Sequence, residues 1–448
     1  MRKLFGTDGI RAIAGEAPLD KPTIYAIGVA LATKLAEAHH PVRVIMGMDT
    51  RESGPWIAST LAAGLRAAGA EVASAGIITT PAIAFLARKH GFSAGVVISA
   101  SHNPWQDNGI KIFGHDGYKL PDNTELAIEQ EITRVLATNP TVPSDPPLPE
   151  VNESYRLDYI RFLLDAVPGI SLDNRSVVID CANGAATSVA PQLFDSLHGT
   201  VQVTHASPDG RNINEHCGAL HPEIVAAQVK VAGASIGFTF DGDADRAMFA
   251  DEHGNVLNGD AVLLLCARDL QARGELAHNL VVATTMSNMG LEAAFARSGI
   301  RMLRAPVGDK YVLEEMRSSG ASLGGEQSGH ILFPARATTG DGLLTALLVL
   351  DVVHRSGKTL SQLIADLTNY PQIILNVKVR EKLPLNTFPA IVAAIAAAEA
   401  DLATTGRVVI RYSGTEPLAR VMIEAESAEA MHRHATTIAN AIRHELGV

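Results

Sequence analysis

Apolar runs and helical patterns alternate along most of the chain. Residues 26–38 have helical spacing of apolar side chains, residues 42–46 form a short apolar run, and residues 56–68 have helical spacing again. The same plan returns where residues 177–180 and residues 280–283 each enter a polar turn. Strands that alternate with helices indicate α/β layers, in which the helices cover a sheet. The pattern therefore predicts three related α/β domains.

The last part of the chain has a different pattern. Residues 373–379 alternate between apolar and polar, an alanine-rich helical stretch follows, and two short apolar runs precede a closing helix over residues 431–446. This order predicts a smaller α+β domain. Five prolines between residues 140 and 149 favour an extended linker after the first domain. We expect domains at residues 1–150, 151–256, 257–370 and 371–448.

Composition and charge argue against several classes of protein. The formal charge of −11 at pH 7 disfavours a general nucleic-acid surface, so local arginine and lysine clusters must bind any anionic ligand. The three cysteines, Cys181, Cys217 and Cys266, include no CxxC pair, which fits a reducing compartment and no cysteine-based zinc site. We see no signal-like apolar segment, and the most apolar stretch, 343–353, is too short to span a bilayer. We expect a cytoplasmic protein without nucleic-acid or membrane partners.

A polar loop follows the apolar run at residues 94–98. It begins at Ser99 and reads Ser-Ala-Ser-His-Asn-Pro, and Pro104 removes a backbone donor and restrains the residue before it. This pattern is typical of a strand that presents a polar loop at a sheet edge, with Ser101 pointing outward. An ordinary turn at a strand end is the alternative, because serine and asparagine are common in turns.

A second polar loop follows the apolar run at residues 236–240. Asp241, Asp243 and Asp245 occupy alternate positions, and alternate side chains of an extended backbone share a face. Carboxylates are hard ligands that suit Mg²⁺. A calcium loop is disfavoured, because Arg246 stands where that loop needs glycine and a strand-like run precedes it. A haloacid-dehalogenase-like phosphatase, with Asp241 as nucleophile, is disfavoured because Asp245 stands where that family has threonine or valine.

With these two loops, the chain resembles the α-D-phosphohexomutase superfamily. It is most similar to the branch that acts on glucosamine phosphates, and the matches run in the family's order between residues 5 and 420. The further matching stretches are residues 5–11, 107–111, 325–330, 338–342 and 411–417. The resemblance implies four domains around a central cleft: three α/β domains and a C-terminal α+β domain that binds phosphate.

The resemblance also implies the catalytic groups. Ser101 would carry a phosphoryl group and would join the three aspartates of the second loop as a metal ligand for Mg²⁺. Arg11 and Lys111 match the family's cations beside the serine. His102 and His330 are candidates for proton transfer. We favour His330 and Lys111, because the side chains of sequence neighbours can point apart, but the identity of the general base stays open.

Substrate contacts follow from the same resemblance. Glu326 and Ser328 would bind O3 and O4 of the sugar, which the reaction leaves unchanged. The stretch that begins at Arg411 combines a planar cation with hydroxyls and a glycine amide, a chemistry that suits phosphate. Arg420, taken alone, fits a surface position equally well. The implied substrate residues are Glu326, Ser328, Arg246, Arg411, Ser413, Gly414, Thr415 and Arg420.

Two positions depart from the family pattern. Ala12 stands where glycine usually follows the Gly-Ile-Arg stretch, and Ala244 replaces the more common glycine of the aspartate loop. The first change would restrict the loop that positions Arg11 if that position needs a positive φ. The second change leaves all three carboxylates present.

The implied activity is that of an isomerase, an intramolecular phosphotransferase. It would interconvert glucosamine 6-phosphate and glucosamine 1-phosphate through a phosphoserine and a sugar bisphosphate, supplying UDP-N-acetylglucosamine synthesis. The alternatives are a phosphomannomutase or phosphoglucomutase, and a non-catalytic sugar-phosphate sensor, against which the intact Ser101 argues. The expected partners are hexosamine phosphates and an unidentified phosphate donor for Ser101. The sequence leaves the oligomeric state open.

Overall fold

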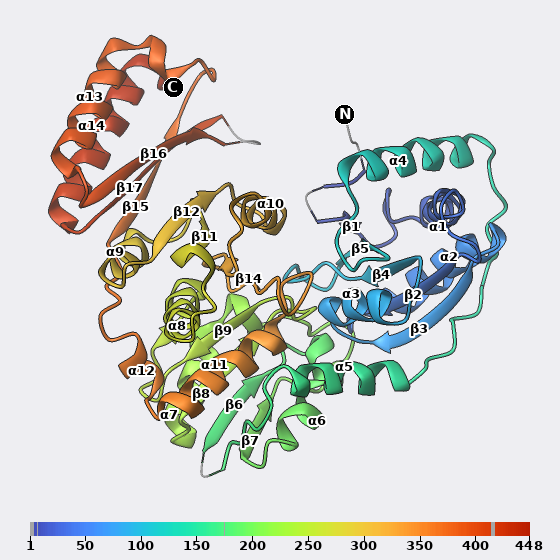
Figure 1. The fold of residues 1–448 in the computed structure, drawn as a ribbon. Helices are drawn as coiled ribbons and strands as arrows, with labels where there is room; N and C mark the ends of the chain where they lie inside the picture. Colours follow the sequence, from blue (N-terminus) through green and yellow to red (C-terminus); the bar gives the residue numbers. More distant parts are fainter. Residues whose placement is uncertain (1–3, 7, 174, 414–416) are drawn as a thin grey trace. The chain divides into compact units, whose positions relative to one another are not determined.

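The computed structural model describes the chain except at residues 1–3, 7, 174 and 414–416. The chain clusters into two compact units (Figure 1). Among the described residues, the first unit holds three sheets with helices packed on them, and the second holds one antiparallel sheet with helices. This confirms the predicted α/β class with a smaller α+β part. The units are Met1–Met286 with Met302–Ala365, and Ser287–Arg301 with Asp366–Val448.

The first sheet has the strand order β1-β5-β4-β2-β3. Strands β3, β2 and β4 are parallel, β5 is antiparallel to β4, and β1 is antiparallel to β5. The strands are β1 (Ile10–Ile13), β2 (Arg43–Met48), β3 (Glu71–Ile77), β4 (Ala94–Ile98) and β5 (Asp107–Gly114). The helices are α1 (Lys21–Leu35), α2 (Gly54–Ala67), α3 (Thr80–Lys89) and α4 (Asp122–Ala137).

Helix boundaries differ from the apolar pattern where a polar side chain caps the first turn. Helix α1 begins at Lys21, before its first predicted residue, because the Asp20 side chain accepts a hydrogen bond from the Thr23 backbone N–H at 2.9 Å. The closing helix α14 (Ala428–Leu446) also begins earlier than predicted, because the Ser427 hydroxyl caps it in the same way. Polar first turns carry little apolar signal, so the pattern underestimates helix length at the amino-terminal end.

The second sheet has the order β10-β9-β8-β6-β7, with β7, β6 and β8 parallel and with β9 antiparallel to β8. Its strands are β6 (Ser176–Asp180), β7 (Thr200–Thr204), β8 (Ile236–Phe240), β9 (Ala247–Ala250) and β10 (Val256–Leu257). The helices around it are α5 (Ser154–Asp165), η1 (Ala185–Ser188), α6 (Ala190–Asp195), η2 (Gly218–Leu220) and α7 (Pro222–Ala232).

The third sheet has the order β12-β11-β13-β14, with β13 parallel to β11 and β14 antiparallel to β13. Its strands are β11 (Leu280–Thr284), β12 (Arg301–Ala305), β13 (Gly324–Gly325) and β14 (Ile331–Leu332). The helices of this part of the sequence are α8 (Gly259–Ala272), η3 (Ala277–Asn279), α9 (Met289–Arg297), α10 (Asp309–Ser319), α11 (Gly342–Ser356) and α12 (Leu360–Leu363).

The three sheets of the first unit share one plan. In each, a parallel strand (β4, β8 or β13) is bonded on its far side to an antiparallel strand that follows it in the sequence. The loop between the two strands starts at the carboxyl end of the parallel strand, where the order of an open α/β sheet changes and ligands commonly bind. Three loops occupy this position: the serine loop (residues 99–106), the aspartate loop (residues 241–246) and the loop from Glu326 to His330.

The second unit is built around the antiparallel order β15-β17-β16. Helix α9 belongs to this unit: the Met289 backbone N–H donates to the buried Glu424 carboxylate at 3.1 Å, and Arg407 joins Glu424 to the Ser287 carbonyl. Its further elements are β15 (Gln372–Lys378), η4 (Leu385–Thr387), α13 (Pro389–Leu402), β16 (Gly406–Tyr412), β17 (Leu418–Ala425) and α14.

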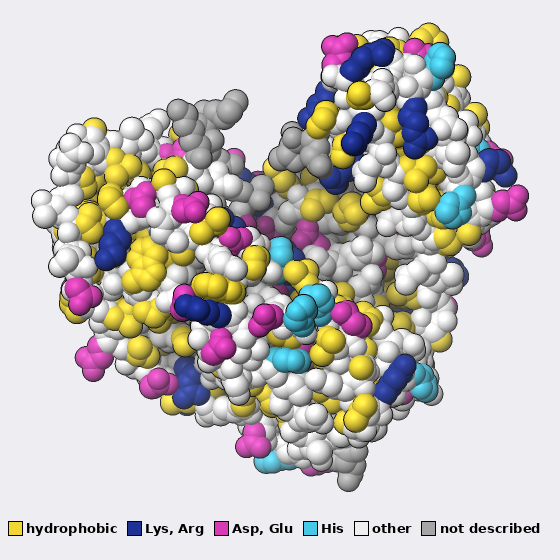
Figure 2. Space-filling model, turned by 180° about the vertical axis from the view of Figure 1, so that it is seen from behind, with side chains coloured by type: hydrophobic (Ala, Val, Ile, Leu, Met, Phe, Trp, Pro, Cys, Tyr) yellow, Lys and Arg dark blue, Asp and Glu magenta, His cyan; other side chains and the backbone are white. Residues whose placement is uncertain are grey.

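The surface charges and the helices bear on two other classes of protein, those that bind nucleic acids and those that span membranes. On the face drawn in Figure 2, lysine and arginine side chains are scattered among acidic and hydrophobic ones. None of the described helices combines the length and the apolar character needed to cross a membrane.

Candidate active site

The three loops of the first unit come together around Ser101. Its hydroxyl donates a hydrogen bond to Asp241 Oδ2 at 2.5 Å. The third loop joins through His330, whose Nδ1 lies 3.7 Å from Asp245 Oδ1. Ser101 is only 1% exposed, so the expected outward orientation is wrong with respect to solvent: the serine faces the aspartate loop, which covers it.

A buried arginine that the sequence analysis missed holds the serine loop. The guanidinium of Arg51 donates to the carbonyls of Ser101 and Asn103 at 2.9 and 2.8 Å, and it pairs with Asp49 at 2.9 Å. Asp49 also accepts hydrogen bonds from the Ser99 hydroxyl at 2.6 Å and from the Arg51 backbone N–H at 3.0 Å. These bonds support Ser101 at a φ of +54°. The sequence did carry a signal for Arg51, because this arginine lies in a polar stretch directly after β2. Strand β2 is parallel to β4, so this stretch lies at the same edge of the sheet as the serine loop.

The aspartate loop packs directly against the serine loop. A Cβ added to Gly242 would lie 2.5 Å from the Ser101 carbonyl oxygen, so only glycine allows this approach. The carboxylates of Asp241, Asp243 and Asp245 are buried, and one oxygen from each lies within 4.8 Å of the others. One oxygen of Asp243 and one of Asp245 have no hydrogen-bond partner among the described residues. Buried carboxylate oxygens that lie close together and lack hydrogen bonds fit a metal cation.

The charges around this loop differ from one carboxylate to the next. Burial, together with the neighbouring Asp245 and Asp243, raises the pKa of Asp241 well above its usual range. Burial also acts to raise the pKa of Asp245, but the charges of Lys111 and His330 outweigh it and hold this pKa well below the usual range. The loop therefore combines a carboxylate that is costly to ionise with one that neighbouring cations keep ionised.

Lys111 lies on β5 and reaches the carboxylates. Its Nζ is 2.7 Å from Asp243 Oδ2, 3.5 Å from Asp245 Oδ2 and 3.0 Å from Asp8 Oδ2. Burial acts to lower the pKa of Lys111, but these carboxylates outweigh it and hold the pKa well above the usual range. Arg11 on β1 contacts Asp8 as well. The two predicted cations are therefore held by Asp8, which the sequence analysis did not single out.

The two candidate histidines have opposite environments. His102 Nδ1 lies 3.4 Å from the Ser101 hydroxyl, and burial together with the charges of Arg246 and Arg11 lowers the pKa of His102 to about 4. Burial acts to lower the pKa of His330 too, but Asp245 and neighbouring carboxylates outweigh it and raise the pKa. His102 is therefore neutral at pH 7.

The third loop presents a carboxylate and a hydroxyl side by side. The Ser328 hydroxyl donates to Glu326 Oε2 at 3.3 Å, and the Gly308 backbone N–H donates to Glu326 Oε1 at 2.9 Å. Gly308 has a φ of +126°, which favours glycine, and it precedes α10. Arg246 lies nearby, with Nε 3.8 Å from Asp245 Oδ1. The sequence analysis missed the segment at Gly308, although a glycine between a strand and a helix was a usable signal.

The candidate phosphate residues lie in the second unit. Arg411 and Arg420 are directly opposite each other in the register of β16 and β17. This placement puts two guanidinium-bearing residues side by side, and guanidinium groups suit an anionic ligand. Ser413 is buried, and its carbonyl accepts a hydrogen bond from Lys382 at 2.7 Å. Gly414 and Thr415 lie outside the described residues.

The two departures from the family pattern prove different in kind. Ala12 lies within β1 opposite Asn108, and its φ is not positive, so the expected restriction of the Arg11 loop does not arise. Ala244 has a φ of +56°, a region that is unfavourable for alanine. The strained substitution is therefore in the aspartate loop.

A second group of potential metal ligands consists of Asp180 at the end of β6, His205 after β7 and Cys217 before η2. Asp180 accepts hydrogen bonds from the backbone N–H groups of Ala182 and Gly218, at 2.8 and 3.1 Å. His205 Nδ1 lies 3.1 Å from the same carboxylate. These contacts give the Asp180 carboxylate a structural role, because it holds the surrounding loops together. We therefore place the candidate metal site at the aspartate loop.

Domain models of one family match nearly the whole chain. The matches are "Phosphoglucomutase/phosphomannomutase, alpha/beta/alpha domain I" at residues 2–138, domain II at 157–254, domain III at 258–370 and the C-terminal domain at 374–441. The chain therefore belongs to the phosphoglucomutase/phosphomannomutase family, whose members are isomerases that transfer a phosphoryl group within a sugar. The resemblance to the phosphohexomutase superfamily is confirmed.

Two relatives with high sequence identity belong to one branch of this family, the phosphoglucosamine mutases. The phosphoglucosamine mutase of Koribacter versatilis (strain Ellin345) is 58% identical over 454 residues, covering 100% of this chain and 98% of that protein. The phosphoglucosamine mutase of Solibacter usitatus (strain Ellin6076) is 52% identical over 446 residues, covering 100% and 99%. The predicted similarity to the glucosamine phosphate branch is confirmed.

Solved structures show the same fold. A phosphoglucomutase/phosphomannomutase family protein from Burkholderia thailandensis has a TM-score of 0.78 at 25% identity, and the match covers 100% of both chains. The N-acetylphosphoglucosamine mutase of Aspergillus fumigatus, solved in complex with GlcNAc-6P and magnesium, has a TM-score of 0.66 at 20% identity, covering 99% of this chain and 96% of that one.

Proposed function

We propose that the chain interconverts glucosamine 6-phosphate and glucosamine 1-phosphate through a phosphorylated Ser101 and a sugar bisphosphate. The observation that carries the proposal is the buried contact between the Ser101 hydroxyl and Asp241, beside two further carboxylates and Lys111. This arrangement suits a nucleophile that carries a phosphoryl group, because it offers both a cation site and a fixed ammonium. The full-length similarity to phosphoglucosamine mutases supports the choice of sugar.

The metal ligands of the proposal are Asp241, Asp243, Asp245 and an oxygen of phosphorylated Ser101. A Mg²⁺ ion held there would supply positive charge against the negative charge that develops on the phosphoryl group. The unpaired oxygens of Asp243 and Asp245 support this ligand set. Lys111 and Arg11 are proposed to stabilise the same charge, and Asp8 holds both.

The reaction as proposed runs twice through the same site. Ser101 gives its phosphoryl group to the free hydroxyl of the sugar monophosphate, the bisphosphate turns around, and the opposite phosphate returns to Ser101. His330 is proposed to move the proton of the attacking hydroxyl, because its buried Nε2 has no hydrogen-bond partner among the described residues. His102 is proposed to hold the serine loop, since its neutral ring lies beside the Ser101 hydroxyl.

The proposed substrate contacts are those that the resemblance implies. Glu326 and Ser328 would bind O3 and O4, and their side-by-side placement suits vicinal hydroxyls. Arg246 would add a charged contact from the aspartate loop. The phosphate that is not transferred would bind to Arg411, Ser413, Gly414, Thr415 and Arg420. Opposed arginines in adjacent strands support this part of the proposal.

We also propose the domain limits and compartment expected above. The domains end at residues 150, 256, 370 and 448, and the compartment is the cytoplasm. All three cysteines are free and buried, which suits a reducing environment. The expected hexosamine phosphate partners and the separate phosphate donor for Ser101 belong to the same proposal.

Turnover of matched substrates tests the proposal. Purified protein is assayed with Mg²⁺ and a trace of sugar bisphosphate on glucosamine 6-phosphate, glucose 1-phosphate and mannose 1-phosphate. We expect the highest kcat/KM with glucosamine 6-phosphate and phosphate on Ser101 in the active fraction. A preference for glucose or mannose phosphate would favour the phosphoglucomutase or phosphomannomutase alternative. Binding without turnover of any of the three would favour a sugar-phosphate sensor.

A further inference from the structure

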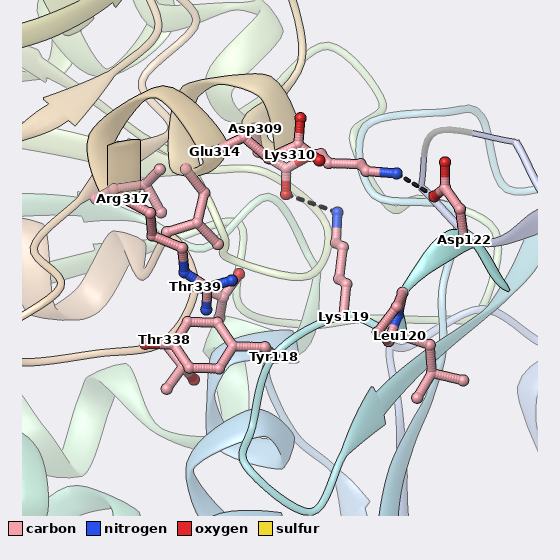
Figure 3. Close-up of a pocket in the computed structure, with 13 residues that line it drawn as sticks. Tyr118, Lys119, Leu120, Asp122, Asp309, Lys310, Glu314, Arg317, Thr338 and Thr339 are labelled. Atoms are coloured by element: carbon pink, nitrogen blue, oxygen red, sulfur yellow. Dashed lines mark hydrogen bonds and ion pairs between the residues drawn. The ribbon is translucent and has the colours of Figure 1, made fainter. Parts of the chain in front are cut away.

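Two lysine–aspartate pairs cross one cavity beside the candidate active site. The cavity has a volume of about 410 Å³ and lies between residues 118–122 and helix α10 (Figure 3). Lys119 pairs with Asp309, and Lys310 pairs with Asp122. The two lysines are similarly buried, with side chains 24% and 28% exposed. Lys119 also contacts Asp8 of the candidate active site, so it bonds to a second carboxylate besides Asp309.

Lys119 bridges two carboxylates that come from distant parts of the chain. Its Nζ lies 2.5 Å from Asp8 Oδ1 and 2.6 Å from Asp309 Oδ2. The second oxygen of Asp8 holds Lys111 at 3.0 Å and also contacts Arg11. Lys119 therefore fixes the orientation of the carboxylate that places both cations near the nucleophile.

The same lysine restrains Asp309 beside the proposed proton carrier. His330 Nε2 lies 3.8 Å from Asp309 Oδ2, which is the oxygen that Lys119 binds at 2.6 Å. A shift of about 1 Å would bring this oxygen within hydrogen-bond distance of Nε2. In the structure, Nε2 is buried and has no hydrogen-bond partner within the described part of the chain. The bond to Lys119 therefore keeps Asp309 from capturing the ring nitrogen.

We propose that Lys119 is a positioning residue for phosphoryl transfer: by bridging Asp8 and Asp309 it places Lys111 and Arg11 and leaves His330 Nε2 free for the substrate. This inference rests on the proposed function, because it assigns a task to residues that the function uses. Among the described residues, Lys119 forms ion pairs with Asp8 and Asp309 and none with Glu326, and it does not bond to Ser328. Because Glu326 and Ser328 would bind the sugar, the effect falls on the chemical step.

Replacing Lys119 by methionine tests the bridge. Without the ammonium, Asp309 is free to bond His330 Nε2, and Asp8 loses one of its fixed contacts. We expect kcat to fall by about 10²-fold, as for other small displacements of catalytic groups, while KM changes little. Lys119→Arg keeps a charge that can contact two carboxylates, so we expect it to recover most of the lost kcat. Lys119→Gln replaces the methionine variant if thermal unfolding shows that the latter does not fold.

A double variant separates positioning from a merely structural role. If Lys119 acts by restraining the Asp309 carboxylate, Asp309→Asn alone should lower kcat only slightly. The Lys119→Met, Asp309→Asn protein should then be at least about tenfold more active than Lys119→Met alone, because the amide does not form the competing ion pair. A structural defect would not be relieved by a second substitution.

Lys310→Met is the matched control. It removes the other lysine of the cavity, of similar exposure, and we expect kcat within about twofold of the wild type. The reason is that its partner Asp122 has a side chain that is 56% exposed, and pairs with such a partner contribute little. Wild-type kcat in Lys119→Met would overturn the proposal. A loss that neither Lys119→Arg nor the double variant relieves would overturn it too.

The assay separates this inference from the proposed function. All variants are compared with wild type on whichever of the three sugar phosphates the wild type turns over best. A different sugar preference contradicts the proposed substrate and leaves the Lys119 comparison intact. A normal preference with unaffected Lys119 variants contradicts the inference alone.

Discussion

The serine loop and the aspartate loop occupy the same position in two sheets of the same plan, yet they are held in different ways. One follows β4 and the other follows β8, and each contains a non-glycine residue with a positive φ, Ser101 at +54° and Ala244 at +56°. A buried charge network around Arg51 supports the serine loop. The aspartate loop is supported by close backbone packing, since a Cβ on Gly184 would lie 2.4 Å from the Gly242 carbonyl oxygen.

The difference follows from what each loop must present. The serine loop offers one hydroxyl, and its carbonyls can be bonded by a buried cation without loss of function. The aspartate loop offers three carboxylates, which Lys111, Arg246 and His330 already contact, and a further cation beneath the loop would compete with a metal ion for them. Support from backbone and glycine adds no such charge. Substitutions in the two loops and in the residues that support them test this difference.

The largest effect is expected from Ser101→Ala. Removal of the hydroxyl leaves no atom to carry the phosphoryl group, so kcat should fall by about 10⁴-fold or more. Turnover of glucosamine 6-phosphate and phosphopeptide mapping measure the change. A variant with wild-type turnover would show that the serine loop is not the nucleophilic half of the site.

Arg51→Met tests the charged support of the serine loop. The change leaves Asp49 buried without its cation and removes donors from several loop carbonyls. We expect a loss of about 3–5 kcal/mol in the free energy of unfolding, which is typical when one partner of a buried ion pair is removed. Denaturant titration measures it. A change below about 1 kcal/mol would mean that packing alone supports this loop.

Asp243→Asn tests the negative charge of the aspartate loop. The amide has the size of the carboxylate but lower affinity for a cation, so activity should fall by about 10²-fold and more Mg²⁺ should be needed. A magnesium titration of turnover provides the measurement, and circular dichroism checks the fold. An unchanged magnesium requirement would remove Asp243 from the ligand set.

Gly184→Ala tests the backbone support of the aspartate loop. The added methyl group has no room beside the Gly242 carbonyl, so we expect a destabilisation of about 1–3 kcal/mol from overpacking. The same protein should bind Mg²⁺ more weakly, because the loop must shift. Normal stability together with normal metal binding would show that the contact is not needed.

The smallest effect is expected from Ala244→Gly. Glycine adopts a positive φ without the penalty that alanine has, so the free energy of unfolding should rise by about 1 kcal/mol while the magnesium requirement stays the same. Thermal unfolding of the two proteins provides the comparison. Lower stability in the glycine variant would indicate that the buried alanine methyl contributes more packing than its conformation costs.

Much of the site could be predicted from the sequence because its main groups follow apolar strands directly. Ser101 and the three aspartates each belong to a short local pattern, and strand ends in α/β sheets gather at one edge. Asp8, Lys119 and Asp309 could not be found in that way. Lys119 and Asp309 are 190 residues apart, and each alone has the pattern of an ordinary surface charge.

The alternation of strands and helices, the positions of the polar loops and the choice of proposed reactive groups follow from the sequence, because each depends on neighbouring residues. Only the folded structure shows which charges are buried, which carboxylate each lysine contacts and which alanine has a strained backbone. These properties depend on distances between segments remote in the sequence and on how far packing excludes water. Asp8 shows this most clearly: it is one acidic residue in a short motif, and the fold makes it the common partner of Arg11, Lys111 and Lys119.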